Sequence, residues 1–165
     1  MSHSTITFLG GGNMASAIYG GLVDNGFTET QITVIDPSES AQQQARNLGL
    51  SCVLSAAPET IEDDLLVLAV KPQIAATVLA SLKGKLSAST TVLSIIAGID
   101  SGSLAAMLGL TNTSTIIRCM PNTPSMVNEG MTALLNNDQC SESGRMLAEQ
   151  VMAAVGKTLW VQEES

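Results

Sequence analysis

Short runs of aliphatic and β-branched residues recur along the chain and alternate with segments whose apolar residues have helical spacing. Continuous apolar runs of this kind predict strands that are buried on both faces, as in a parallel sheet covered by helices. The predicted strands are residues 5–9, 32–35, 65–70, 91–96, 114–119 and 157–161.

The segments between these runs predict helices, because their apolar residues repeat every three or four positions. Asn25-Gly26 and Leu48-Gly49 predict helix ends, since glycine readily adopts the left-handed conformation after a last turn. Strands and helices in alternating order predict an α/β fold, with helices on both faces of a doubly wound, mainly parallel sheet. The apolar stripes are Met14, Ile18 and Leu22; Ile74, Val78 and Leu82; and Leu147, Val151, Ala154 and Val155.

Composition narrows the class of protein. The chain has 165 residues, which suits one domain, and only 2% of its residues are aromatic, so its core is expected to be aliphatic. Its net charge of −8 argues against a nucleic-acid partner. The three cysteines form no C-x-x-C pair and no metal-ligand spacing is present. Without a leader-like start or a long apolar stretch, the chain is expected to be cytoplasmic and free of membrane spans.

The first predicted strand runs into a glycine-rich stretch, "FLGGGNMASAI". Gly10, Gly12 and Ala15 match the pattern G-x-G-x-x-A at a strand-to-helix junction, which is where the dinucleotide fingerprint occurs. Gly10 permits a tight turn, Gly12 lets the backbone approach a pyrophosphate, and Ala15 lets the helix pack closely on the strand. The motif predicts a Rossmann-type, dinucleotide-binding fold; the alternative is an ordinary glycine-rich turn.

Asp36 follows the second predicted strand, at about the 20-residue spacing expected for the carboxylate that binds the adenosine ribose. This spacing favours NAD over NADP, because a 2′-phosphate would meet a carboxylate with no arginine beside it, although Ser38 offers a hydroxyl. The alternative is that Asp36 only initiates the turn before Pro37.

Further candidates lie where other strands end. Lys71 and Arg118 place positive charge at the sheet edge where α/β proteins bind ligands, unless each is simply a surface residue packed by its stem. Ala97 and Gly98 leave room for a flat group beside the backbone, or merely ease a bend. The segment "CMPNTPSM" (119–126) carries two prolines that would hold Asn122 and Thr123 rigidly near a cofactor, or simply stiffen a connection.

The segments "FLGGGNMASAI", "AVKPQ" (69–73), "SIIAGI" (94–99) and "RCMPNTPSMVNEGMTAL" (118–134) together resemble the N-terminal domain of the pyrroline-5-carboxylate reductase family. The resemblance implies NADPH- or NADH-dependent reduction of 1-pyrroline-5-carboxylate to L-proline, the last step of proline biosynthesis. It implies these cofactor-binding residues: Gly10, Gly11, Gly12, Asn13, Met14, Asp36, Ser38, Ala69, Val70, Lys71, Pro72, Ala97, Gly98, Asn122 and Thr123.

The resemblance also implies a second, helical domain that binds the substrate, supplies the polar residues near the imine and forms a homo-oligomer. We expect residues 1–161 to form the NAD(P)-binding domain and residues 162–165 to begin a linker to that domain, which the chain lacks. The catalytic residues are then expected outside this chain, and the chain alone is expected to be inactive. The alternatives are a β-hydroxyacid dehydrogenase-like oxidoreductase and a non-catalytic nucleotide-binding module.

Overall fold

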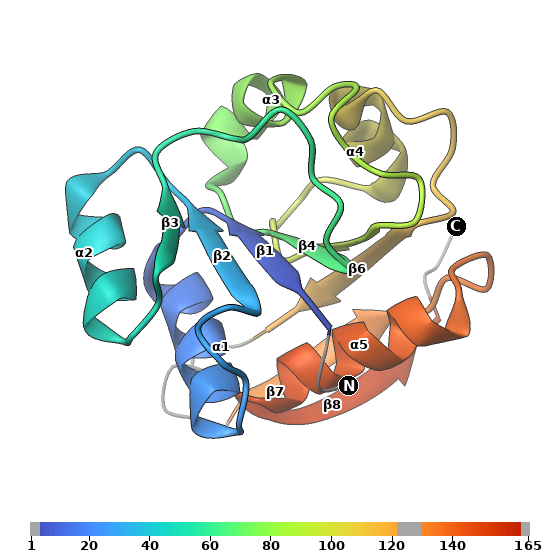
Figure 1. The fold of residues 1–165 in the computed structure, drawn as a ribbon. Helices are drawn as coiled ribbons and strands as arrows, with labels where there is room; N and C mark the ends of the chain where they lie inside the picture. Colours follow the sequence, from blue (N-terminus) through green and yellow to red (C-terminus); the bar gives the residue numbers. More distant parts are fainter. Residues whose placement is uncertain (1–3, 122–129, 163–165) are drawn as a thin grey trace.

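The computed structural model describes residues 4–121 and 130–162, which form a twisted sheet with helices on both of its faces (Figure 1). The elements follow the predicted alternation of strands and helices. The strands are β1 (Ile6–Leu9), β2 (Ile32–Ile35), β3 (Cys52–Leu54), β4 (Leu65–Leu68), β5 (Thr91–Ser94), β6 (Ile116–Met120), β7 (Gly130–Leu135) and β8 (Gly156–Val161); the helices are α1 (Asn13–Asp24), α2 (Glu39–Asn47), α3 (Pro72–Ala80), α4 (Ser101–Leu108) and α5 (Glu142–Ala153).

The strand order of the sheet is β3-β2-β1-β4-β5-β6-β7-β8. Neighbouring strands are parallel except for β6 and β7, which are antiparallel. The chain moves outward from β1 to β3 and then returns to place β4 on the other side of β1, so the winding direction reverses between these two strands. Leu9 of β1 is opposite both Ile35 of β2 and Leu68 of β4, so the three carboxyl ends are level.

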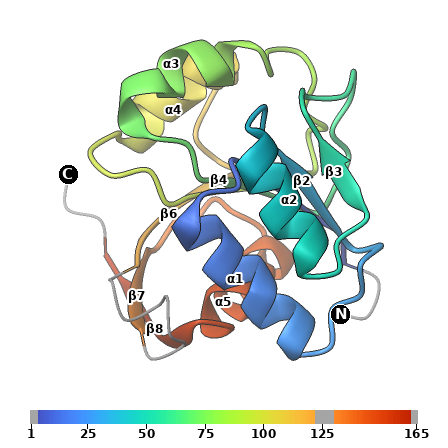
Figure 2. The same ribbon diagram turned by 90° about the vertical axis from the view of Figure 1, so that its left-hand side faces the viewer.

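Each face of the sheet has its own apolar core. Ile6 and Phe8 of β1 point into a cluster with α1, α5 and Ala45 of α2, whereas Leu9 points into a second cluster with α3 and α4. Figures 1 and 2 show α3 and α4 on one face and α1 and α5 on the other. This is the doubly wound, mainly parallel Rossmann-type fold that the sequence predicts.

The sequence prediction agrees best where strands are buried on both sides. All six predicted strands are confirmed, with ends shifted by up to two residues, and so are the helix ends at Asn25 and Leu48. The prediction missed β3, because its half-buried to exposed apolar run is only three residues long, and it missed β7. No helix in the described ranges is both long enough and apolar enough to cross a bilayer.

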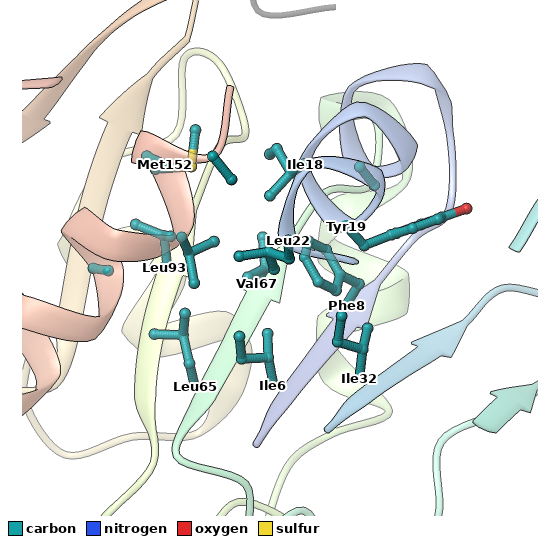
Figure 3. Packing of buried hydrophobic residues seen from close by; sticks show 14 of the residues in the cluster. Ile6, Phe8, Ile18, Tyr19, Leu22, Ile32, Leu65, Val67, Leu93 and Met152 are labelled. Carbon is teal, nitrogen blue, oxygen red and sulfur yellow. The ribbon is translucent and has the colours of Figure 1, made fainter. Parts of the chain in front are cut away.

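The first core contains the chain's single tyrosine. Tyr19 packs edge-on against Phe8, with ring centroids 5.6 Å apart, and Figure 3 shows its hydroxyl pointing away from that ring. The hydroxyl is buried and has no hydrogen-bond partner among the described residues. Burial, with the negative charge of Asp36 as a second cause, raises the pKa of Tyr19 to about 12.

We predict that tyrosinate absorbance of the folded chain rises with a midpoint near the Tyr19 pKa of about 12. An unfolded tyrosine titrates at about 10. The fold favours the neutral phenol, so the neutral Tyr19 contributes to the free energy of unfolding. This contribution is fully present below about pH 10 and is lost as pH rises toward the folded pKa. Spectrophotometric titration with circular dichroism on the same sample tests this, with Tyr19→Phe as the control that removes the signal. A midpoint near the ordinary value in a still-folded chain contradicts the prediction.

Candidate dinucleotide-binding site

A cleft of about 690 Å³ lies at the carboxyl ends of β1, β2 and β4. This is the point where the winding of the sheet reverses, which is where open α/β sheets bind ligands. Its volume falls in the range of about 300–1,000 Å³ that is usual for small-molecule sites. The cleft is lined by Leu9, Gly10, Gly12, Ile35, Asp36, Pro37, Ser55, Ala69, Val70, Lys71, Ile74, Thr77, Val78 and Ser81.

Gly10 joins the ends of the three strands. Its N–H donates to the Ile35 carbonyl of β2 at 2.8 Å, and the Ala69 N–H after β4 donates to the Leu9 carbonyl at 2.9 Å. Gly10 has φ +101°, and a Cβ on it would lie only 2.7 Å from the Ala69 carbonyl oxygen. Both its backbone angle and the close strand contact therefore require glycine, in agreement with the predicted tight turn.

Gly12 has a different reason for being glycine. Its φ of −70° suits any residue, and a Cβ built on it meets no atom of the described residues within 4 Å. The space beside Gly12 is therefore open and belongs to the cleft that it lines. Ala15, one turn further on, is buried in the first core, which agrees with the close helix packing predicted for it.

The helices that begin at the cleft differ from the others in their N-terminal caps. The helices α2, α4 and α5 each have a side-chain cap, from Ser38, Asp100 and Ser141 respectively. By contrast, α1 begins after Gly12 and α3 begins after Lys71 without a side-chain cap. Uncapped helix starts offer N–H groups and a partial positive charge to an anion. The two helices that start at residues lining the cleft are thus the ones suited to phosphate.

Asp36 is held in place by the backbone around it. One of its carboxylate oxygens accepts from the Gly11 N–H at 2.8 Å, and the other accepts from the Ser38 N–H at 2.8 Å. The second contact is the turn predicted as the alternative role of Asp36. The first contact was not anticipated, and it ties the end of β2 to the glycine loop while the side chain still lines the cleft.

One wall of the cleft is a part of α3 that the sequence prediction did not assign to the site. Ala75 and Leu79 form the buried side of α3, whereas Ile74 is 50% exposed and Val78 is half-buried. Ile74 and Val78 line the cleft, together with Thr77 of the same helix and Ser81 at its end, and Val78 also packs against the second core. The sequence gives this helix two apolar stripes, because Ile74 and Ala75 are adjacent, but helical spacing alone does not tell which stripe meets the core.

The structure brings only part of the predicted site together. Gly10, Gly12, Asp36, Ala69, Val70 and Lys71 line the cleft. Gly11 faces Val34 and Ala41, Ser38 caps α2, and Pro72 is the first residue of α3. Residues off the cleft wall are Asn13, in the groove between α1 and α2; Met14, against the first core; and Ala97 and Gly98, exposed after β5. Asn122 and Thr123 lie outside the described residues.

Arg118 lies in β6 opposite Ser94, near the carboxyl end of the parallel strands. The pKa of Asp100 is lowered by its hydrogen bonds with Ser103 at the start of α4, and the positive charge of Arg118 adds to this effect. The positive charge of Arg118 is therefore close enough to act on the Asp100 carboxylate. Within the described ranges no cluster of three or more metal-ligating side chains occurs.

The fold and the cleft define a Rossmann-type domain built to bind a dinucleotide. The chain belongs to the family described as NADP oxidoreductase coenzyme F420-dependent, whose model matches residues 5–98.

Known relatives extend the likeness over the whole chain. The chain is 38% identical to the pyrroline-5-carboxylate reductase of Haemophilus influenzae, covering 100% of this chain and 60% of the relative. Among solved structures, a pyrroline-5-carboxylate reductase from Coxiella burnetii matches with a TM-score of 0.87 and 35% identity over 98% of this chain and 60% of that one. The Plasmodium falciparum pyrroline carboxylate reductase with NADP bound matches with a TM-score of 0.82 and 28% identity, over 99% of this chain and 59% of that one.

These relatives confirm the resemblance found in the sequence motifs. The chain spans about 60% of the length of the curated relatives that it matches.

We predict that Gly10→Ala destabilises the chain more than Gly26→Ala. Both glycines have φ just above +100°, so both variants lose about 1–2 kcal/mol in the free energy of unfolding from backbone strain. Only at Gly10 does the new Cβ also collide with Ala69, which adds about 1–3 kcal/mol, whereas at Gly26 it meets no atom within 4 Å. Urea denaturation of both variants measures the difference. Equal losses would show that the strands do not approach closely at Gly10.

Proposed function

We propose that this chain supplies the NAD(P)H-binding part of a pyrroline-5-carboxylate reductase, which reduces 1-pyrroline-5-carboxylate to L-proline. The observation that carries the proposal is the open space at Gly12 beside the uncapped start of α1, in a cleft at the point where the sheet reverses direction. The substrate and the reaction are taken from the pyrroline-5-carboxylate reductases that match the whole chain.

The residues present fit a nicotinamide dinucleotide. The backbone of Gly10, Gly11, Gly12, Asn13 and Met14 would hold the pyrophosphate, because the uncapped N-terminus of α1 offers its N–H groups there. The adenosine would lie between Asp36, with Ser38 nearby, and the apolar wall formed by Ile74 and Val78.

The remaining residues would serve the reactive end of the cofactor. The ribose and nicotinamide would be bordered by Ala69, Val70 and Lys71, which connect β4 to α3, and by Pro72, the first residue of α3. Ala97 and Gly98 after β5 would border them as well. Gly98 has φ +78° and no atom within 4 Å of a Cβ built on it, so flat groups can approach the backbone there. Asn122 and Thr123 would close the pocket. A bound nicotinamide supplies the hydride, and the role of these residues is to orient it.

We further propose that residues 1–161 form the cofactor-binding unit, that residues 162–165 begin the connection to a helical domain, and that this domain binds the substrate and forms a homo-oligomer. The length of the relatives supports a second part of this kind, since the chain matches 60% of the H. influenzae reductase. We also place the protein in the cytoplasm, where the free thiols of Cys52, Cys119 and Cys140 would stay reduced.

We predict that Gly12→Val weakens cofactor binding without unfolding the chain. The new side chain points into open space, so the free energy of unfolding changes by no more than about 1 kcal/mol, the usual scale of a cap substitution. The dissociation constants for NADH and NADPH should both rise at least about tenfold, because the valine occupies the place of the pyrophosphate. Fluorescence titration with a parallel urea melt measures both. Unchanged affinities would remove Gly12 from the site.

The reaction is tested with a hybrid enzyme. Replacing the matched 60% of the H. influenzae reductase by this chain should give a protein that oxidises NADH or NADPH only when 1-pyrroline-5-carboxylate is added. The Gly12→Val hybrid is the matched control and should be much less active at the same cofactor concentration. A folded hybrid that binds cofactor but reduces no pyrroline-5-carboxylate would favour the non-catalytic module.

A further inference from the structure

The carboxylate of Asp36 is fixed at one side of the cleft. Two backbone N–H groups, those of Gly11 and Ser38, each donate to a different carboxylate oxygen at 2.8 Å. A carboxylate oxygen accepts more than one hydrogen bond, so both oxygens keep acceptor capacity toward the cleft. Hydroxyl groups of a ribose can satisfy that capacity as donors, whereas a phosphate at neutral pH brings negative charge and acceptor oxygens.

The groups near Asp36 offer little to a phosphate. The Ser38 hydroxyl already accepts from the Ala41 N–H at 3.4 Å and pairs with the Ser40 hydroxyl at 2.9 Å. The side-chain cap therefore covers the start of α2, and the first turn of α2 carries the negative charge of Glu39. The end of β2 thus presents a carboxylate, a capped helix start and a second acidic residue.

The charged residues that line the cleft are Asp36 and Lys71. Lys71 follows β4, and β1 lies between β4 and β2 in the sheet. Neighbouring strands are about 4.8 Å apart, so the backbones at the two residues are separated by roughly 10 Å across the sheet. Lys71 is therefore placed toward the side of the cleft at α3, whereas no lysine or arginine is among the described residues that line the Asp36 side.

We propose that the cleft selects NADH over NADPH and that Asp36 is the specificity-determining residue, which also braces the glycine loop through Gly11. This inference rests on the proposed function, because it assumes that the cleft binds the adenosine half of the cofactor. It sets this chain apart from the P. falciparum relative, whose structure was solved with NADP. Like charges placed together at a binding site are unfavourable, so the preference should be at least about tenfold.

The test uses ADP-ribose and 2′-phospho-ADP-ribose, which differ only in the phosphate, alongside NADH and NADPH. Calorimetric titration of the 165-residue chain should give at least about tenfold tighter binding of ADP-ribose and of NADH than of their phosphorylated partners. Asp36→Asn removes the charge, keeps the size of the side chain and keeps an oxygen that can accept from one N–H. In this variant the dissociation constants of each phosphorylated ligand and its unphosphorylated partner should differ by less than about threefold. The change should come mainly from tighter binding of the 2′-phosphorylated ligands.

Asp24→Asn is the matched control, because it removes one negative charge at the last residue of α1, at the end of the helix away from the cleft. It should leave both ratios of dissociation constants unchanged.

Lys71→Ala should weaken the binding of all four ligands alike. A selective loss of binding of the 2′-phosphorylated ligands would assign the phosphate to Lys71 and overturn the inference. Equal or tighter binding of 2′-phospho-ADP-ribose by the unmodified chain, or an unchanged ratio in Asp36→Asn, would also overturn it. Failure of all four ligands to bind would instead reject the proposed function.

Discussion

The site depends on the contact between two backbones at the centre of the sheet. Gly10 turns out of β1 so close to Ala69, which follows β4, that a methyl group would fall 2.7 Å from a carbonyl oxygen. Hydrogen bonds from Gly10 to Ile35 and from Ala69 to Leu9 hold the ends of β1, β2 and β4 level. Because these strand ends share one edge, the residues that follow them, Gly12, Asp36 and Lys71, come to line one cleft.

The helices that start at the cleft differ from the others in how their N-termini are capped. The helices α2, α4 and α5 are closed by their own serine or aspartate caps, which is the stable arrangement for an isolated helix start. The starts of α1 and α3 give up that stabilisation. A phosphate supplied by a ligand can replace the cap, so binding and helix stability are coupled at these positions.

Asp36 shows how one residue serves the fold and the site together. Its contact with Ser38 forms the turn into α2, and its contact with Gly11 fixes the glycine loop, so the carboxylate is already oriented without any ligand. Preorganisation of this kind lowers the cost of binding, because little side-chain freedom is left to lose. Burial of Tyr19 on α1 raises the pKa of its hydroxyl, and the negative charge of Asp36 adds to this effect.

The sequence by itself determined the alternation of strands and helices, the glycine turn, and the candidates at the strand ends, because each of these is set by local periodicity or by backbone angles that only glycine accepts. It did not reveal β3, whose half-exposed apolar run is only three residues long. Nor did it reveal the role of Ile74 and Val78, since helical spacing alone does not tell a stripe that meets the core from one that lines a cleft. The contact between Asp36 and Gly11 joins residues 25 positions apart, and only the tertiary structure decided it. The physical reason is that such contacts depend on the order of strands in the sheet, which brings β1, β2 and β4 together and which no local pattern specifies.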